Sequence, residues 1–272
     1  MGGNCSTTAC CEDINAGRTV GDLKELNRQR AAIEQYKQTE YPAVNYDDGS
    51  VYKGEWRANE HVREGYGVQS WVDGSKYVGY WRNDKANGYG RLYHADGDYY
   101  EGEWLDDNAH GQGIYIQTNG TRYEGQWRND KQEGVGVETW ADGSRYEGAY
   151  IEGRKMGRGK MLFADGSSYE GEFMDDDING YGTYKWQDGK VYTGAWLNNK
   201  MSGNGKMTWP DGKVYEGEFF DDKRHGYGVY RWEDGRIYEG NWRLGKQDGK
   251  GFYTNANGER TAGEWSAGKR LE

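Results

Sequence analysis

The residues whose chemistry can be named most directly lie in the first eleven positions of the chain. The sequence opens Met-Gly-Gly-Asn-Cys-Ser, which fits the pattern for N-myristoylation with Gly2 as the acceptor after removal of the methionine. All three cysteines of the chain, Cys5, Cys10 and Cys11, lie in the same segment. Because one myristoyl chain gives only marginal membrane binding, a second acyl chain on a nearby thiol would make the anchor stable. We therefore predict myristoylation at Gly2 and palmitoylation at Cys5, Cys10 or Cys11, with Cys5 best placed.

Two other interpretations of this segment stay open: cysteines without a role in a disordered tail, or a metal or disulfide cluster. An odd number of cysteines with no adjacent histidine disfavours a zinc site, and a thiol in the reducing cytosol is seldom bridged. We expect residues 1–20 to form a flexible acylated tail. No run of eighteen apolar residues occurs, so the sequence predicts no membrane-spanning helix.

Elsewhere the residues suited to chemistry recur along the chain, whereas a catalytic centre would be a singular feature. A Gly-x-Gly pair such as residues 88–90 recurs, but a phosphate-binding loop needs a following helix and none is predicted. The acidic segment 175–177 lacks the spacing of a calcium-binding loop. His110 and His225 share one repeat position and are expected in loops, and no residue stands in a nucleophile–base arrangement. The sequence therefore predicts no enzymatic activity, no cofactor and no metal site.

The sequence repeats with a period of 23 residues, and this period indicates which structural elements position the side chains. A tyrosine, a glycine two residues later and an aromatic two residues after that recur from Tyr77 to Trp242, and an earlier copy begins at Tyr52. A fixed period of this length indicates a stack of small units. Aromatics make up 15% of the residues, so their rings would supply the buried area that aliphatic side chains supply elsewhere.

The segment 123–145 illustrates how each repeat is expected to fold. Tyr123, Gly125 and Trp127 alternate, so a strand places them on one face. The polar segment 129–131 suits a hairpin loop. A second strand then ends near an aromatic, and an Asp-Gly or Asn-Gly turn follows. The aromatic expected in the second strand recurs as Trp71, Trp140, Phe163, Trp186, Trp209 and Trp232.

These residues resemble the MORN repeat, whose consensus is close to Tyr-x-Gly-x-Trp, a polar loop, Gly-x-Gly, an aromatic and Asp-Gly. The departures are an insertion near residues 60–63, and His94 and Gln117 where the second aromatic is expected. The resemblance implies an all-β fold: an elongated, single-layer antiparallel β-sheet solenoid of about nine MORN hairpins over residues 46–272, ending in a half-repeat. It also implies that the curved aromatic face docks peptides or helices of partner proteins.

One short amphipathic helix is predicted over residues 22–38, before the array. Asp22 and Glu25 are spaced as a capping box. Apolar residues recur at helical spacing, and Pro42 prevents continuation. We expect residues 21–40 to cap the exposed first edge of the sheet. A helix that binds a partner or a membrane surface is the alternative.

The net charge of −10 disfavours nucleic acid as a partner and direct binding of phosphoinositides by the array. The sequence thus predicts a non-enzymatic scaffold or adaptor for protein partners, anchored to the cytosolic face of the plasma membrane or an internal membrane system. The alternative is a structural subunit of a ciliary, axonemal or other cytoskeletal assembly, similar to radial-spoke MORN proteins. The C-terminal half-repeat, expected to lack a second strand, is a candidate edge for a homodimer. Candidate contacts for partners are Trp127, Trp140, Phe163, Phe173, Trp186 and Trp196.

Overall fold

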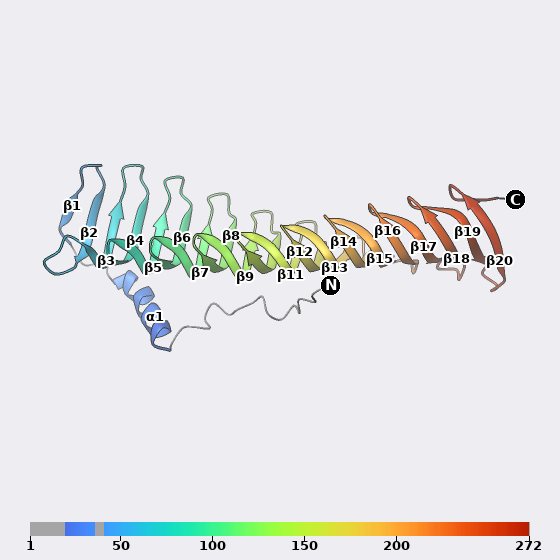
Figure 1. The fold of residues 1–272 in the computed structure, drawn as a ribbon, viewed down its shortest axis with the longest axis horizontal. Helices are drawn as coiled ribbons and strands as arrows, with labels where there is room; N and C mark the ends of the chain where they lie inside the picture. The colour runs from blue at the N-terminus through green and yellow to red at the C-terminus, as the bar shows by residue number, and fades with distance from the viewer. Residues whose placement is uncertain (1–19, 36–40, 272) are drawn as a thin grey trace, which may run out of the picture. The chain divides into compact units, whose positions relative to one another are not determined.

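The computed structural model describes residues 20–35 and 41–271, so the predicted acylation sites Gly2, Cys5, Cys10 and Cys11 lie outside the described residues. One helix, α1 (Val20–Gln35), precedes 21 strands of antiparallel sheet in which consecutive strands form hairpins (Figure 1). This confirms the predicted all-β fold with one N-terminal helix, and α1 begins two residues earlier and ends three residues earlier than expected.

The chain divides into two compact units, each built from the same hairpins. Unit 1 comprises Met1–Gly143 and Ala149–Arg154, and unit 2 comprises Ser144–Gly148 and Lys155–Glu272. The strands of unit 1 are β1 (Ala43–Asn45), β2 (Val51–Trp56), β3 (Arg63–Ser70), β4 (Lys76–Arg82), β5 (Lys85–Tyr93), β6 (Tyr99–Leu105), β7 (Asn108–Ile116), β8 (Arg122–Arg128) and β9 (Lys131–Thr139). Residues of both units contribute to β10 (Arg145–Ile151). The strands of unit 2 are β11 (Arg154–Leu162), β12 (Ser168–Met174), β13 (Asp177–Lys185), β14 (Val191–Leu197), β15 (Lys200–Thr208), β16 (Val214–Phe220), β17 (Lys223–Arg231), β18 (Ile237–Arg243), β19 (Lys246–Thr254), β20 (Arg260–Ser266) and β21 (Lys269–Arg270).

The hairpin β8–β9 shows the repeat in detail. A two-residue loop joins the strands, and its residues Asn129 and Asp130 both have positive φ, 48° and 64°. This is the backbone that two-residue hairpins favour, and asparagine and aspartate tolerate it. Gly125 pairs with Gly136, but Gln126 pairs with Glu133, so the second strand bulges between them. The extra residues re-aim the side chains at that point of the strand.

The aromatics predicted to lie in the second strand stand one step beyond it. Each follows the last strand residue and opens the Asp-Gly turn, and the turn is closed by bonds such as Gly189 N to Trp186 O at 3.0 Å. The prediction was wrong in placement because the turn already begins at the aromatic, directly after the last residue pair of the ladder, as between Arg122 and Thr139. His110 and His225 also differ from expectation, since they lie in β7 and β17 and not in loops.

The hairpin loops bond back to the preceding repeat. In the β8–β9 loop, the N–H of Asp130 donates to Ala109 O at 3.1 Å, and Asp130 Oδ1 accepts the N–H of Ala109 at 2.7 Å. Asp107 makes the same pair of bonds with Ala86, at 3.0 and 2.7 Å. These bonds satisfy backbone groups that the bulge leaves outside the ladder. The loops therefore fold over the ring-bearing face and form one wall above it.

The rings on that face pack edge to face in a row within each unit, which we call the ring row. In unit 2, Tyr192 lies 5.1 Å from Trp196 of its own repeat and 5.0 Å from Phe219 of the next, measured between ring centroids. The Tyr192 hydroxyl donates to Ala195 O at 2.9 Å, which satisfies its polar atom in the core. A Cβ on Gly205 would lie 2.4 Å from the Tyr192 ring, so the glycine leaves the space in which the ring lies. The core is thus a layer of aromatic rings that lie flat over the glycines of the neighbouring strands.

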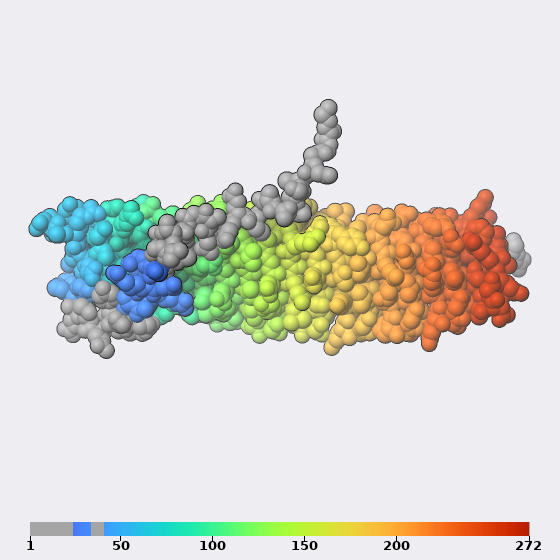
Figure 2. Space-filling model, turned by 90° about the horizontal axis from the view of Figure 1, so that it is seen from below, coloured from blue at the N-terminus to red at the C-terminus, as the bar shows by residue number. Residues whose placement is uncertain are grey.

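Helix α1 packs on the other face of the sheet in unit 1. It contacts β5 and, to a smaller extent, β4, and in Figure 2 it lies on the surface of the strands coloured blue to teal. Ile33 is only 5% exposed and anchors the helix. The first edge, which the helix was predicted to cap, is formed by β1. The structure therefore places α1 on an inner pair of strands.

The C-terminal half-repeat contains more than one strand. The two-residue β21 pairs antiparallel with β20, with Trp265 opposite Arg270. The prediction that no second strand follows is therefore wrong. A short strand of this kind offers little unpaired backbone for edge-to-edge association.

Candidate functional site

A groove runs along the ring-bearing face of unit 1. Its first section has a volume of about 650 Å³ and extends over β5 to β9. A second section of about 760 Å³ continues over β1 to β6, and the two sections share Leu92, Trp104 and Asp107. Together we call them the ring groove. It is the kind of concave, mostly apolar surface on which ligands and partner segments bind.

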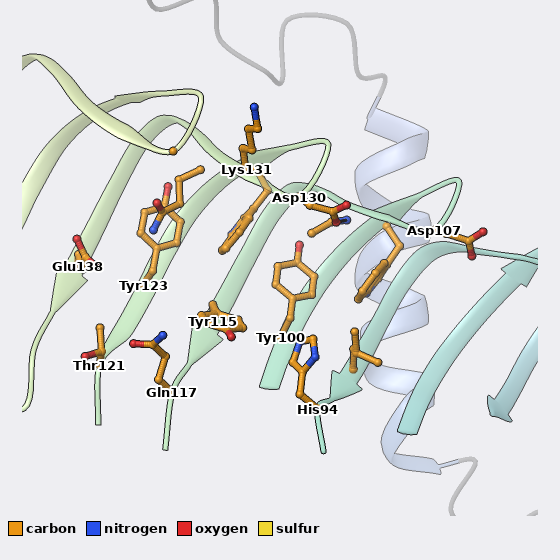
Figure 3. Close-up of a pocket in the computed structure, with 16 residues that line it drawn as sticks. His94, Tyr100, Asp107, Tyr115, Gln117, Thr121, Tyr123, Asp130, Lys131 and Glu138 are labelled. Carbon is orange, nitrogen blue, oxygen red and sulfur yellow. Dashed lines mark hydrogen bonds between the residues drawn. The ribbon is translucent and has the colours of Figure 1, made fainter. Parts of the chain in front are cut away.

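The floor of the ring groove is aromatic. Figure 3 shows Tyr100, Tyr115 and Tyr123 side by side between two rows of polar residues. Trp104 and Trp127 complete the floor, and their ring N–H groups donate to Gly90 O and Gly113 O at 3.1 and 3.2 Å. Because the buried polar atoms of these rings are already bonded within the sheet, the floor presents an apolar surface to a ligand.

The two walls come from the two kinds of turn. Asp107, Asp130 and Lys131 rise from the hairpin loops on one side, and His94 and Gln117 stand on the other side, at the turns between repeats (Figure 3). The hairpin-loop wall is held in place by the bonds from Asp107 and Asp130 to the preceding repeat. The lining residues are therefore fixed by backbone bonds that recur in each repeat.

The groove is open where a recurring ring is absent. At the first turn residue, unit 2 has Trp186 and Trp232, which pack against Tyr184 and Tyr230 at 4.5 and 4.6 Å between centroids. Unit 1 has Trp71 and Trp140 at this position in two of its repeats, and His94 and Gln117 in the two repeats between them. Gln117 supplies no ring beside Tyr115 at the place where Trp186 packs on Tyr184, and Tyr115 has His94 and Trp127 as ring neighbours, each 6.2 Å away between centroids. The departures that the sequence shows at His94 and Gln117 thus coincide with the groove.

Carboxylates dominate the charge of the ring groove. Its two sections are lined by two cations, Arg63 and Lys131, and by five carboxylates, namely Asp48, Asp84, Asp107, Asp130 and Glu138. Arg63 is already engaged, because its guanidinium stacks 4.0 Å above the Trp81 ring and pairs with Asp84 at 3.3 Å. The Oδ1 atoms of Asp107 and Asp130 accept backbone N–H groups, which leaves an acidic oxygen of each beside the groove. The surface favours a cationic ligand.

Hydrogen bonds hold Tyr115 and Asp98 in fixed ionisation states at the base of the wall. The Tyr115 hydroxyl donates to Asp98 Oδ2 at 2.8 Å, and the N–H of Thr118 donates to Asp98 Oδ1 at 2.8 Å. Burial, and then the bond to Asp98, raise the pKa of Tyr115 to about 12. The bonds from Thr118 and Tyr115 lower the pKa of Asp98 below its usual value. Both groups are therefore structural at neutral pH, with Tyr115 neutral and Asp98 charged.

The six aromatics predicted as partner contacts fall into two groups. Trp127, Phe173 and Trp196 are 6 to 7% exposed and belong to the ring row, and among the six only Trp127 lines the ring groove. Phe163 and Trp186 are half-buried turn residues that pack against Tyr184, and Trp140 is a half-buried turn residue as well. Sequence reasoning missed His94, Asp107, Tyr115 and Gln117 as lining residues, although two of them were noted as departures from the repeat.

The part of the chain that the structure describes contains no group of three histidine, cysteine, aspartate or glutamate residues arranged to hold a metal ion. Within the same residues, no helix has the length and apolar character needed to cross a membrane.

Solved structures resemble the chain only distantly. No curated protein has significant sequence similarity to the chain. Among solved structures, the TCP10 domain of Danio rerio CPAP is 13% identical with a TM-score of 0.42, covering 74% of this chain and 94% of that one. The SAS-4 TCP domain of Drosophila melanogaster is 14% identical with a TM-score of 0.35, covering 66% and 90%. Likeness at these scores carries no inference about function.

The repeat itself is recognised along most of the chain. Nine consecutive segments match the MORN repeat, at residues 52–76, 77–99, 100–122, 123–145, 146–168, 169–191, 192–214, 215–235 and 238–260. Each match contains a first strand, a loop, a second strand and the turn described above. The loop is two residues long except in the first match, where residues 57–62 separate β2 and β3. The chain therefore belongs to the MORN-repeat family.

Proposed function

We propose that this protein is a non-enzymatic scaffold whose ring groove binds a segment of a partner protein that carries apolar side chains flanked by lysine or arginine. The observation that supports it best is the gap over Tyr115, where Gln117 takes the place of a ring. The aromatic floor suits apolar side chains, and the surplus of carboxylates on the walls suits cationic ones.

The groove proposal is tested by photo-crosslinking in cells. A photoreactive phenylalanine analogue replaces Gln117 in one variant and Trp209, the matched turn residue of unit 2, in another. Crosslinks from position 117 that are lost when His94→Trp is added, with position 209 silent, support the proposal. Equal crosslinking from both positions, or crosslinks indifferent to His94→Trp, would reject the ring groove as the binding site.

The membrane anchor is a second part of the proposal and rests on the sequence of the first eleven residues. A chain acylated at Gly2 and at one of Cys5, Cys10 and Cys11 would hold the repeats at a cytosolic membrane face. Gly2→Ala should move the protein from the membrane to the soluble fraction. Replacing the three cysteines by serine should leave weak, reversible binding.

The same fractionation separates the cytoskeletal alternative from the anchored scaffold. A detergent-insoluble pool that persists in the Gly2→Ala variant would favour a structural subunit of a cytoskeletal or ciliary assembly. Release into the soluble fraction would favour the membrane-anchored scaffold.

A further inference from the structure

One position on the face opposite the rings recurs with a defined structural role. The residue between the glycine and the second aromatic of the first strand reaches across to the bulge of the second strand. There its side chain accepts the N–H between the two glycines, and we call this side chain the bulge acceptor. The bonds are Tyr66 N to Glu55 Oε2 at 3.2 Å, Gln112 N to Glu103 Oε1 at 2.8 Å, Val135 N to Gln126 Oε1 at 3.0 Å and Tyr227 N to Glu218 Oε1 at 3.0 Å.

In the repeat of β4 and β5 the bulge acceptor is missing, and α1 supplies it. Tyr80 occupies the position, and Gln29 of α1 accepts the N–H of Tyr89 at 3.1 Å. A Cβ on Gly88 would lie 2.4 Å from Gln29 Oε1, so the amide fills the same space as the acceptors of other repeats. Ile33 is buried one helical turn later on the same side of α1. This is why the helix packs on β4 and β5.

Unit 2 contains the same vacancy without a helix. Ala195 occupies the acceptor position in β14, and the bulge opposite it contains Gly203, with φ of +75°, and Asn204. The nearest atom to a Cβ on Gly203 would be the Ala195 methyl at 3.4 Å, whereas at Gly134 and Gly226 an acceptor side chain lies within 2.5 Å. Among the described residues, no side chain accepts a bond from Asn204 N. Gly203 and Asn204 are both exposed.

Two exposed tyrosines flank this vacancy. Tyr181 in β13 is 59% exposed and pairs with Ala195, and Tyr227 in β17 is 49% exposed. Each stands two strands from β15, so about 10 Å separates each from the vacancy. A helix is about 10 Å across and would fit between the two rings. In unit 1 the residue equivalent to Asn204 is Tyr89, and the Arg30 guanidinium of α1 lies 5.8 Å from the centroid of its ring.

We propose that the surface formed by Tyr181, Ala195, Gly203, Asn204 and Tyr227 is a second helix-docking site. Its occupant is a helix of a partner protein with the chemistry of the docking face of α1: a glutamine whose amide oxygen accepts the N–H of Asn204, and an aliphatic residue four positions later. A second copy of the chain is not the occupant, because Gln29 and Ile33 of its α1 are already engaged with its own β4 and β5. This site lies in unit 2 and shares no residue with the ring groove, which lies in unit 1.

The test uses the full chain, labelled with nitrogen-15, and a synthetic peptide with the sequence of residues 20–35. The amide resonance of Asn204 should shift saturably, while that of Val135, bonded to Gln126, stays in place. Short helices are marginal in water, so the dissociation constant should be on the order of 1 mM. A peptide with leucine in place of glutamine should bind at least about tenfold more weakly.

Two variants of the chain make the test reciprocal. Ala195→Gln supplies a bulge acceptor within the repeat and should abolish the shift at Asn204. Gln126→Ala removes one and should create a new peptide-dependent shift at Val135. Binding that is unchanged by Ala195→Gln would overturn the proposal. Shifts confined to Tyr89, which indicate exchange with α1 alone, would overturn it as well.

Discussion

Units 1 and 2 use the same 23-residue frame and differ at a few fixed positions. At the turn position, His94 and Gln117 leave a groove over the rings of unit 1, whereas Trp186 and Trp232 cover the rings of unit 2. Where Tyr80 occupies the acceptor position in unit 1, Gln29 of α1 accepts the N–H of the bulge. Where Ala195 occupies it in unit 2, no described side chain accepts the N–H of Asn204. A repeat protein can therefore open a groove or expose a backbone N–H by omitting one recurring side chain, without changing the backbone.

If both units share one type of core, alkaline pH should unfold both within one range. Burial raises the pKa of Tyr169 and of Tyr238 to about 12, and it also raises the pKa of Tyr100 in unit 1. The pKa of a tyrosine in an unfolded chain is about 10. The folded chain keeps protons that the unfolded chain releases, so stability is intact below pH 10 and falls as the pH rises toward 12.

The loss should reach about 1.4 kcal/mol per pH unit for each buried tyrosine, which makes this the largest expected effect. Urea unfolding at a series of pH values, with tyrosinate absorbance followed in parallel, measures it. A free energy of unfolding that stays level up to pH 12 would show that the hydroxyls are not held by the sheet.

Removing one ring from each unit tests whether the stability of the two units depends equally on the ring row. Tyr100→Ala in unit 1 and Tyr192→Ala in unit 2 should each cost about 3–5 kcal/mol, because both rings are buried between two neighbouring rings. Tyr181→Ala, at an exposed position, should change stability by less than about 0.5 kcal/mol. Chemical denaturation of the three variants makes the comparison, and a clear difference between the first two would show that the cores are not equivalent.

The role of α1 in unit 1 is tested by Gln29→Ala. Removing the acceptor leaves the N–H of Tyr89 unpaired under the helix, at a cost of about 1–3 kcal/mol. Hydrogen exchange of the α1 amides should become faster, while exchange in unit 2 stays the same. Gln29→Glu keeps an acceptor oxygen and serves as the matched control. Unchanged exchange in Gln29→Ala would show that Ile33 alone holds the helix.

The smallest expected effect comes from exchanging the turn residues of the two units. Gln117→Trp should cover Tyr115 and raise stability by about 0.5–1.5 kcal/mol, as expected for an aromatic pair. Trp186→Gln should lose a similar amount by uncovering Tyr184. Thermal unfolding of both variants measures the two changes in stability. Midpoint shifts of the same sign would contradict the expectation that the two substitutions have opposite effects.

Pattern reasoning predicted the hairpins because alternation and turn residues are local properties. Tyr123, Gly125 and Trp127 share a face as expected, and Asn129 and Asp130 form the loop. The turn aromatics were misplaced because the turn begins at each of them. His110 and His225 were misplaced because the hairpin loops before them are only two residues long, so β7 and β17 begin earlier than expected. The side chains of Asp107 and Asp130 were assigned only to loops, since their bonds reach 21 residues back along the chain.

The sequence by itself determined the repeat, its strands and turns, and its membership of a family, because each of these depends on residues within one 23-residue period. Only the tertiary structure decided which surfaces are free. The ring groove depends on rings from successive hairpins lying side by side, and the docking of α1 depends on Gln29 meeting a bulge that lies 60 residues away. Contacts at such separations are set by how the hairpins stack, which no local pattern encodes.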